Sequence, residues 1–177
     1  MKKVILLAGP TASGKSDLAI FLAKKIDGEI INADSMQVFK EIKILSARPN
    51  NYNGIKHHLY GFLSVKKNFS TGEWLKLVEK KVIQIIRKKK IPIIVGGTGL
   101  YFKSLSDGLA KIPDVTQAQR QKVTSLYNKI GNKEFYKKLI KLDPECKNKI
   151  SFNDKQRMIR FYEVKFYTKK SIFLWQK

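Results

Sequence analysis

The chain has 177 residues, of which 43% are hydrophobic, so it can bury the core of one domain with a small appendage and is not intrinsically disordered. Its formal net charge of +22 favours a nucleic-acid partner. However, few of its 36 basic residues are arginines, and an AT-rich genome would encode such a lysine-rich surface on any solvated protein. No apolar run approaches the ~20 residues of a membrane span, and no signal peptide precedes the first strand. The lone Cys146 cannot form an internal disulfide. The expected compartment is therefore the cytoplasm.

The N-terminal part carries a pattern that predicts phosphate binding. Residues 4–8 form an apolar run typical of a buried strand, and Leu18, Leu22 and Ile26 have the spacing of an amphipathic helix. The residues between them fit the P-loop pattern, in which backbone N–H groups cradle phosphate oxygens, Lys15 reaches those oxygens and the Ser16 hydroxyl binds Mg²⁺. The predicted phosphate-binding residues are Gly9, Pro10, Thr11, Ala12, Ser13, Gly14, Lys15 and Ser16. The pattern does not identify the molecule that carries the phosphates.

A second strand is predicted at residues 29–33, after a helix that we expect to end at Gly28. Asp34 follows this strand. Because ligands of open α/β sheets bind at the carboxyl ends of the strands, Asp34 is expected to face the same crevice as the P-loop. A carboxylate in this place positions a metal ion, acts as a base or caps the next turn, and the spacing does not choose between these roles.

The next segment, residues 40–68, is predicted to be irregular. Its paired His57 and His58 have no cysteine or acidic cluster near them in sequence, so no metal site is expected there. Ser70 and Glu73 form a capping box that predicts the start of a long helix, and residues 91–95 predict a third strand that leads into a second glycine turn. Strands separated by helices predict an α/β fold, a P-loop NTPase-like parallel sheet with flanking helices, over residues 1–112.

The remaining residues, 113–177, show no strand pattern and predict a mostly helical part. Thr116 and Asn132 are expected to cap two helices, and Pro144 to begin a short third one. Either Asn153 or Asp154 is expected to begin a fourth helix that runs to about residue 167.

Six ordered motifs span nearly the whole chain: GPTASGKS at 9–16, ADSMQV at 33–38, ARP at 47–49, HHL at 57–59, GGTGLYF at 96–102 and NDKQR at 153–157. In these motifs the chain resembles the bacterial tRNA dimethylallyltransferases, a family also called tRNA isopentenyltransferases. The resemblance implies an enzyme that transfers a dimethylallyl group from dimethylallyl diphosphate to N6 of adenosine 37 in tRNAs that read codons beginning with U. It also implies Mg²⁺ as the cofactor, tRNA as the partner, and a monomer that does not associate with membranes.

By the same resemblance, the P-loop holds the diphosphate, Lys15 and Asp34 are the catalytic residues, and Asp34 removes the proton from the adenine amine. The residues expected to contact tRNA are Asp34, Ser35, Met36, Gln37, Thr98, Arg120, Gln156, Arg157, Met158, Ile159 and Arg160. The alternative for Arg157 and Arg160 is pairing with Glu163, and the alternative for Met158 and Ile159 is a place in the core.

The chain departs from the family pattern in three respects. Phe39 replaces the usual tyrosine, Lys169 replaces the usual glycine, and the chain resembles only the N-terminal part of the longer family members. We therefore expect a truncated protein that lacks a strand of the core and leaves residues 4–8 as an outer strand with one unpaired edge. We expect this chain alone to be poorly soluble or oligomeric, and weakly active at best. Two alternative functions remain open: a P-loop kinase or ATPase that uses ATP on a small metabolite, and an inactive RNA-binding remnant.

Overall fold

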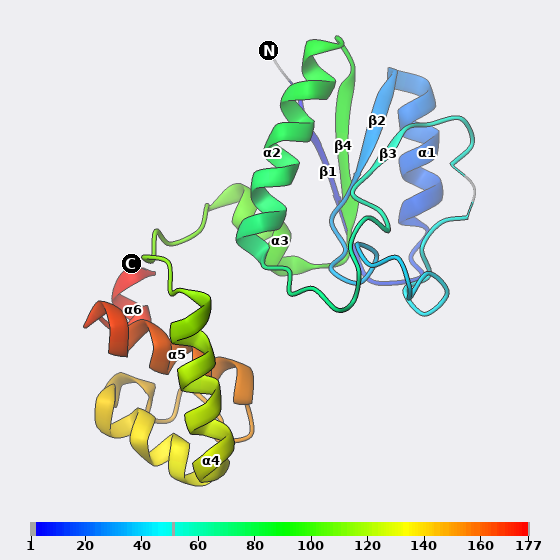
Figure 1. Cartoon of the computed structure of the whole chain (residues 1–177). Coiled ribbons are helices and arrows are strands. Elements are labelled where there is room, and N and C mark those ends of the chain that lie inside the picture. Colours follow the sequence, from blue (N-terminus) through cyan, green and yellow to red (C-terminus); the bar gives the residue numbers. More distant parts are fainter. Residues whose placement is uncertain (1–2, 51, 177) are drawn as a thin grey trace. The chain divides into compact units, whose positions relative to one another are not determined.

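The computed structural model describes residues 3–50 and 52–176, and it divides the chain into two compact units (Figure 1). The first unit, Met1–Gly108, combines a sheet with helices, and the second, Leu109–Lys177, is helical. None of the helices in the described ranges is both long enough and apolar enough to span a membrane.

A parallel sheet forms the centre of the first unit. Its strands lie in the order β1 (Ile5–Ala8), β4 (Ile91–Gly96), β2 (Gly28–Asn32) and β3 (His57–His58). All the neighbouring strands pair in parallel, and β2 is buried along its whole length, as expected for a strand covered on both faces. The predicted fold class is therefore confirmed.

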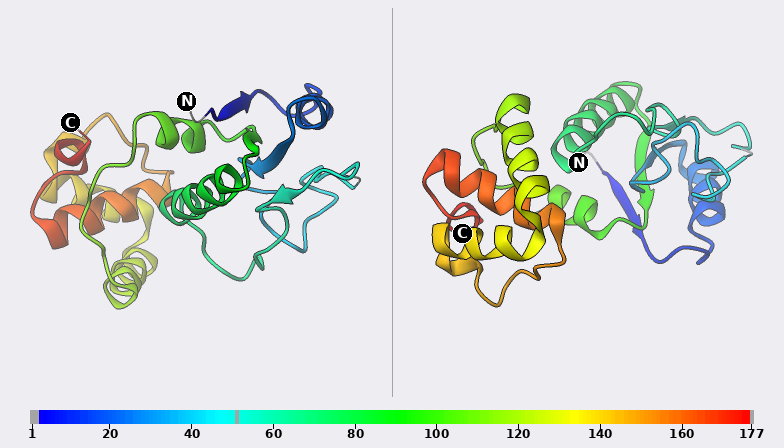
Figure 2. Two further views of the ribbon diagram at one scale, coloured as in Figure 1. Left: turned by 90° about the horizontal axis from the view of Figure 1, so that it is seen from above. Right: turned by 60° about the horizontal axis from the view of Figure 1, so that its bottom comes forward.

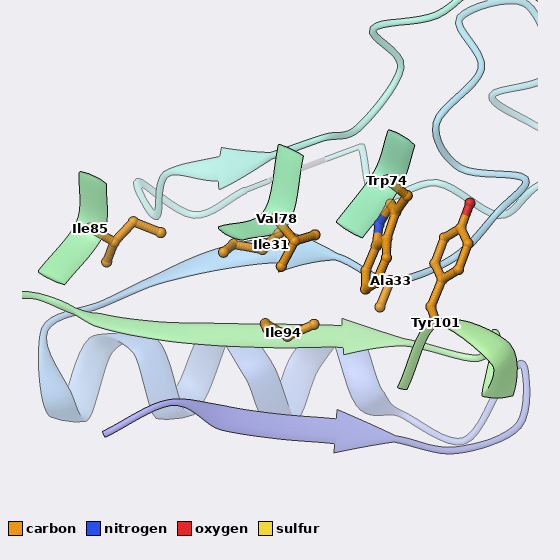
Figure 3. Close-up of a cluster of buried hydrophobic side chains, with 7 residues drawn as sticks. All are labelled: Ile31, Ala33, Trp74, Val78, Ile85, Ile94 and Tyr101. Atoms are coloured by element: carbon orange, nitrogen blue, oxygen red, sulfur yellow. The ribbon is translucent and has the colours of Figure 1, made fainter. Parts of the chain in front are cut away.

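Helices cover both faces of this sheet (Figure 2). On one face α1 (Lys15–Ile26) buries Ala19 and Ala23 against Ile30 and Ile93. On the other face lie α2 (Thr71–Arg87) and α3 (Gly99–Ser106), whose side chains join those of the strands in a second cluster (Figure 3). That cluster comprises Ile31, Ala33, Trp74, Val78, Ile85, Ile94 and Tyr101. The predicted capping box at the start of α2 is confirmed, because the side chains of Ser70 and Glu73 each bond the other's backbone N–H.

Two details of the first unit differ from the sequence-based expectations. Gly28 does not end α1: Asp27 takes the left-handed conformation after the helix (φ 50°), and Gly28 is the first residue of β2. Glycine is needed there because a Cβ would lie 2.9 Å from Ile93 Cδ1 and 3.0 Å from the Ile91 carbonyl oxygen. The segment predicted to be irregular contains β3, whose two residues are too short for a periodic signal and are defined by pairing with Ile30 and Ile31.

The outer position predicted for the first strand is confirmed. Among the described residues β1 pairs with β4 alone, so one of its edges is unpaired. Val4, just before β1, and Leu6, within it, are 40% and 49% exposed.

The second unit consists of α4 (Gln117–Leu142), the 3₁₀ turn η1 (Pro144–Cys146), α5 (Lys155–Thr168) and α6 (Ile172–Trp175). Gly131 (φ 78°) breaks α4 into the two helices that were predicted, and the Asn132 side chain accepts a hydrogen bond from Lys133 N just after the break. Thr116 caps α4 and Asp154 caps α5, as expected. The core of this unit is built around Phe135, Leu139, Met158 and Tyr162, all from α4 and α5.

Candidate active site at the carboxyl edge of the sheet

The predicted P-loop connects β1 to α1 as a tight, mostly exposed turn. Gly14 has a φ of 75°, which glycine adopts without strain, and it offers no side chain to cap the helix. The first N–H groups of α1 therefore face outward with the positive end of the helix dipole. The Lys15 ammonium folds back over the loop, where it donates to the Pro10 carbonyl and to Ser13 Oγ (3.2 Å). A phosphate at this turn would meet backbone donors and an ammonium group together.

Asp34 lies at the carboxyl end of β2, as predicted. Its Oδ1 accepts hydrogen bonds from Met36 N (2.8 Å) and Gln37 N (3.4 Å), so one carboxylate oxygen caps the following turn. This is the turn-capping role that the spacing left open, and within the described part of the chain it engages one of the two oxygens, Oδ1. The side chain is partly buried.

Gly97 brings Asp34 and the P-loop to the same point of the sheet edge. A Cβ on Gly97 would lie 3.3 Å from the Gly9 carbonyl oxygen and 3.8 Å from Asp34 Oδ2. The backbone at the start of the P-loop and the second carboxylate oxygen of Asp34 are thus close to the same glycine. The neighbouring Gly96 is more tightly constrained, since a Cβ there would lie 2.1 Å from the Ala33 carbonyl group. The turn at the end of β4 therefore favours glycine at these two positions, because the backbones of Gly9 and Ala33 approach it closely.

Thr98 joins the loop after β4 to the loop after β2. Its Oγ1 accepts a hydrogen bond from Ser35 N (2.9 Å) and lies 3.3 Å from Ser35 Oγ, while its own N–H donates to the Ala33 carbonyl (3.2 Å). Ser35 and Thr98, both expected to contact tRNA, therefore lie together beside Asp34.

Hydrogen bonds join the segments around Gln37 and Arg48 beside the carboxyl edge of the sheet. Gln37 Nε2 donates to the Ser46 carbonyl (2.9 Å), and the Gln37 carbonyl accepts from Gly61 N (2.9 Å). Arg48 donates to the Phe39 carbonyl (3.1 Å) and lies over Gly61, where a Cβ would be 1.6 Å from its Nη1. The two motifs ADSMQV and ARP are adjacent for this reason, and Arg48 has a positioning role there.

Asn32 is a site residue that the sequence analysis missed. It is fully buried at the end of β2, and its side-chain amide bonds both backbone polar groups of Asp34. The available signal was a lone amide among apolar residues of a buried strand, two positions before Asp34.

The histidine pair lies on β3 and has an acidic partner that its sequence neighbourhood does not contain. His58 Nε2 is 2.6 Å from Glu29 Oε2, and Lys88 Nζ is 3.3 Å from Glu29 Oε1. Burial lowers the pKa of His58 below its ordinary value, so the imidazole is neutral at neutral pH. His57 stacks on Tyr52 with ring centroids 4.2 Å apart. Within the described ranges, no group of three or more His, Cys, Asp and Glu side chains is arranged to hold a metal ion.

In the helical unit, two of the arginines expected to contact tRNA share one buried carboxylate. Arg120 Nε and Arg160 Nη1 lie 3.6 Å and 3.8 Å from Glu163 Oε2, and Glu163 is 1% exposed. Burial raises the pKa of the Glu163 carboxyl and lowers the pKa of the Arg160 guanidinium. Both arginine side chains remain partly exposed, so pairing with Glu163 does not remove them from solvent.

The other residues expected to contact tRNA differ in exposure. Gln156 and Arg157 are exposed on the first turn of α5, where Arg157 Nε lies 3.3 Å from Asp154 Oδ2. Ile159 is partly buried. Met158 is fully buried in the core of this unit, on the inward face of α5, which is the alternative place that the sequence left open for it.

Comparison with known proteins finds relatives that are named tRNA dimethylallyltransferases. A family model described as IPP transferase matches residues 37–177. A tRNA dimethylallyltransferase of Pelagibacter ubique (strain HTCC1062) is 59% identical over 175 residues, which are 98% of this chain and 56% of that protein. One of Rickettsia bellii (strain OSU 85-389) is 51% identical over 177 residues, which are 99% of this chain and 56% of that protein. The chain thus spans about half the length of the curated relatives it matches.

Two solved structures of such transferases are also similar to this chain. A eukaryotic dimethylallyltransferase captured while acting on tRNA is 34% identical, with a TM-score of 0.78 over 97% of this chain and 43% of its own. The tRNA isopentenylpyrophosphate transferase of Bacillus halodurans is 30% identical, with a TM-score of 0.62 over 97% of this chain and 57% of its own.

Proposed function

The chain belongs to the IPP transferase family, and from this premise we propose that it takes part in transferring a dimethylallyl group from dimethylallyl diphosphate to N6 of an adenosine in tRNA. The observation that carries the proposal is the position of Gly97, with the Gly9 carbonyl and Asp34 Oδ2 both near it. A phosphate-binding loop and a carboxylate at one edge provide the groups that the reaction needs: a place for the leaving group and an acceptor for a proton.

The P-loop binds the diphosphate of the donor in this proposal. When the allylic carbon–oxygen bond breaks, its electron pair stays on the diphosphate, and the loop N–H groups and Lys15 stabilise the added negative charge. Ser16 is exposed in the first turn of α1, and such a hydroxyl suits Mg²⁺, which binds few protein ligands besides phosphate oxygens and water. Bound there with the diphosphate, the ion would neutralise part of its charge.

Asp34 is the proposed base. The adenine amine is a poor nucleophile because its lone pair is delocalised into the ring, so formation of the N6–carbon bond requires that N6 lose a proton. Asp34 Oδ2 accepts that proton, while Oδ1 stays bonded to the turn at Met36 N. The adenine must leave its stack to reach the carboxylate, as bases modified by other enzymes do.

The proposed tRNA contacts fall in two groups. Ser35, Met36, Gln37 and Thr98 surround Asp34 and would bind the nucleotides next to the reacting base. On the helical unit, the contacts would come from Arg120, Gln156, Arg157, Ile159 and Arg160, the arginines binding phosphates and Met158 supporting α5 from the core. The net charge of +22 supports a polyanionic partner.

Incubation of the protein with unmodified tRNA, Mg²⁺ and dimethylallyl diphosphate tests the proposal, with a parallel incubation with ATP. We expect isopentenyl-adenosine in digested tRNA and no ADP. ADP without a modified nucleoside would instead support the P-loop kinase or ATPase. Binding of tRNA without either product would support the RNA-binding remnant. The matched control for the variant Asp34→Asn is Asp107→Asn, which changes an exposed aspartate at the end of α3, outside the site.

A further inference from the structure

We propose that Asn32 is a positioning residue for the Asp34 carboxylate. The inference rests on the proposed function, because it concerns the residue that we propose as the base. It assigns a role to a fully buried amide at the end of β2.

The Asn32 side chain holds Asp34 at both of its backbone polar groups. Asn32 Oδ1 accepts a hydrogen bond from Asp34 N (2.9 Å), and Asn32 Nδ2 donates to the Asp34 carbonyl (3.0 Å). The same Nδ2 also donates to the Leu59 carbonyl (3.0 Å), which connects Asp34 to the chain after β3. With both peptide groups of Asp34 bonded to one rigid amide, the direction of its Cα–Cβ bond is determined by Asn32.

Asn32 is itself fixed from the opposite side. Its backbone carbonyl accepts a hydrogen bond from Trp74 Nε1 (2.9 Å), and Trp74 stacks on Tyr101 with ring centroids 4.0 Å apart and an interplanar angle of 14°. Figure 3 shows these two rings packed side by side above the end of β2, near Ala33. Trp74 comes from α2 and Tyr101 from α3, so two helices of the first unit hold Asn32 in place.

The remaining freedom of the carboxylate is its own rotation, which the turn removes. Met36 N donates to Asp34 Oδ1, and this bond leaves Oδ2 near Gly97. Asn32 therefore determines where the side chain starts, and the turn determines how the carboxylate is rotated. A buried strand of this kind needs only an apolar residue for packing, and an amide costs free energy unless its polar atoms are bonded. The bonds of Asn32 go to Asp34 and its surroundings, which is why we assign the amide to the positioning of that residue.

Asn32→Ser tests the inference, because serine is smaller and its hydroxyl has a single donor hydrogen, so it cannot replace all three bonds that the amide makes to Asp34 and Leu59. Amide hydrogen exchange, read residue by residue in the ligand-free protein, should show faster exchange at Met36 and Gln37 by about tenfold or more, since the turn loses its support. Exchange at Ile94 in the central strand should stay unchanged. The matched control Asn128→Ser alters an exposed amide of the helical unit and should change neither.

Transfer kinetics provide the second readout. Asn32→Ser should lower the rate at saturating substrates about tenfold and leave the Kd values for dimethylallyl diphosphate and tRNA within a factor of two. Unchanged exchange at Met36, or an equal rise in exchange at Ile94, would overturn the positioning role and leave the proposed function intact. An undiminished rate in Asp34→Asn would instead overturn the proposed function, and the exchange measurement would still decide whether Asn32 positions Asp34.

Discussion

His58 Nε2 and Glu29 Oε2 are 2.6 Å apart, and this hydrogen bond lies buried between β2 and β3. Burial lowers the pKa of His58 below 6.5 despite the neighbouring carboxylate. Burial alone would raise the pKa of Glu29, but the hydrogen bonds from His58 and Lys88 outweigh it and lower the pKa below 4.5. Both groups therefore bind protons more weakly in the folded chain than in the unfolded chain.

The first prediction is that the protein loses stability on acidification. Between about pH 6.5 and the lower folded pKa of His58, the unfolded chain binds more protons, so the free energy of unfolding falls as the pH falls. Glu29 adds to the loss below about pH 4.5. We expect the Tm, measured by circular dichroism, to decrease from about pH 7.5 to about pH 5.5, and to decrease less in His58→Gln. A His58→Gln variant with the wild-type pH dependence would contradict the assignment to this pair.

The second prediction concerns the proposed base. Asp34→Asn should lower the single-turnover transfer rate by about 100-fold or more, because the amide cannot accept the proton from N6. Binding of dimethylallyl diphosphate, measured by calorimetry, should stay within a factor of two, because the P-loop contacts are unchanged. A wild-type rate in this variant would show that Asp34 only caps its turn.

The third prediction separates the two ligands. Lys15→Ala should weaken dimethylallyl diphosphate binding about 10- to 100-fold, since a charged hydrogen-bond donor to the phosphates is lost. tRNA binding should change little. The control is Lys24→Ala, which removes an exposed lysine from the last turn of α1. Equal losses for both ligands would mean that Lys15 supports the loop structure through its bonds to Pro10 and Ser13.

The fourth prediction is that Arg160 binds a phosphate of tRNA. Arg160→Ala should weaken tRNA binding and reduce the slope of log K against log salt by about one unit. Lys137→Ala is the control, since Lys137 pairs with Glu134 on the exposed face of α4 and has no assigned role. If the slope does not change, the Arg160 side chain serves only to neutralise Glu163, from which it lies 3.8 Å.

The fifth prediction follows from the unpaired edge of β1. A strand edge with exposed apolar side chains is a template for pairing with a second chain, so the 177-residue chain should self-associate at micromolar concentration. Leu6→Lys should shift the mass measured by light scattering toward the monomer. Leu174→Lys removes a similarly exposed leucine from α6 and should not. A wild-type chain that remains monomeric would show that this edge is protected.

Local patterns in the sequence determined much of this protein. The P-loop, the capping boxes at Ser70 and Thr116 and the helix start at Asp154 are each defined within a few residues, because caps and turns satisfy backbone groups of their own neighbours. The placement of Asp34 at the edge shared with the P-loop was also predictable, since parallel strands end on the same side of a sheet. The outer position of β1 was predictable from the family resemblance, which implies a strand order in which a later strand pairs with the first one, together with the three strands recognised in the sequence.

Only the tertiary structure decided which distant groups meet. Asn32 bonds the carbonyl of Leu59, 27 residues away, and Thr98 bonds Ser35, 63 residues away, so neither contact leaves a periodic signal in the sequence. The contacts of Glu29 with His58 and of Arg120 with Glu163 leave no such signal either, because the two residues of each pair come from different elements. The burial of Met158 also depends on tertiary packing. A position on α5 faces the core or the solvent according to how α5 is rotated against α4, and the type of side chain alone does not specify that rotation.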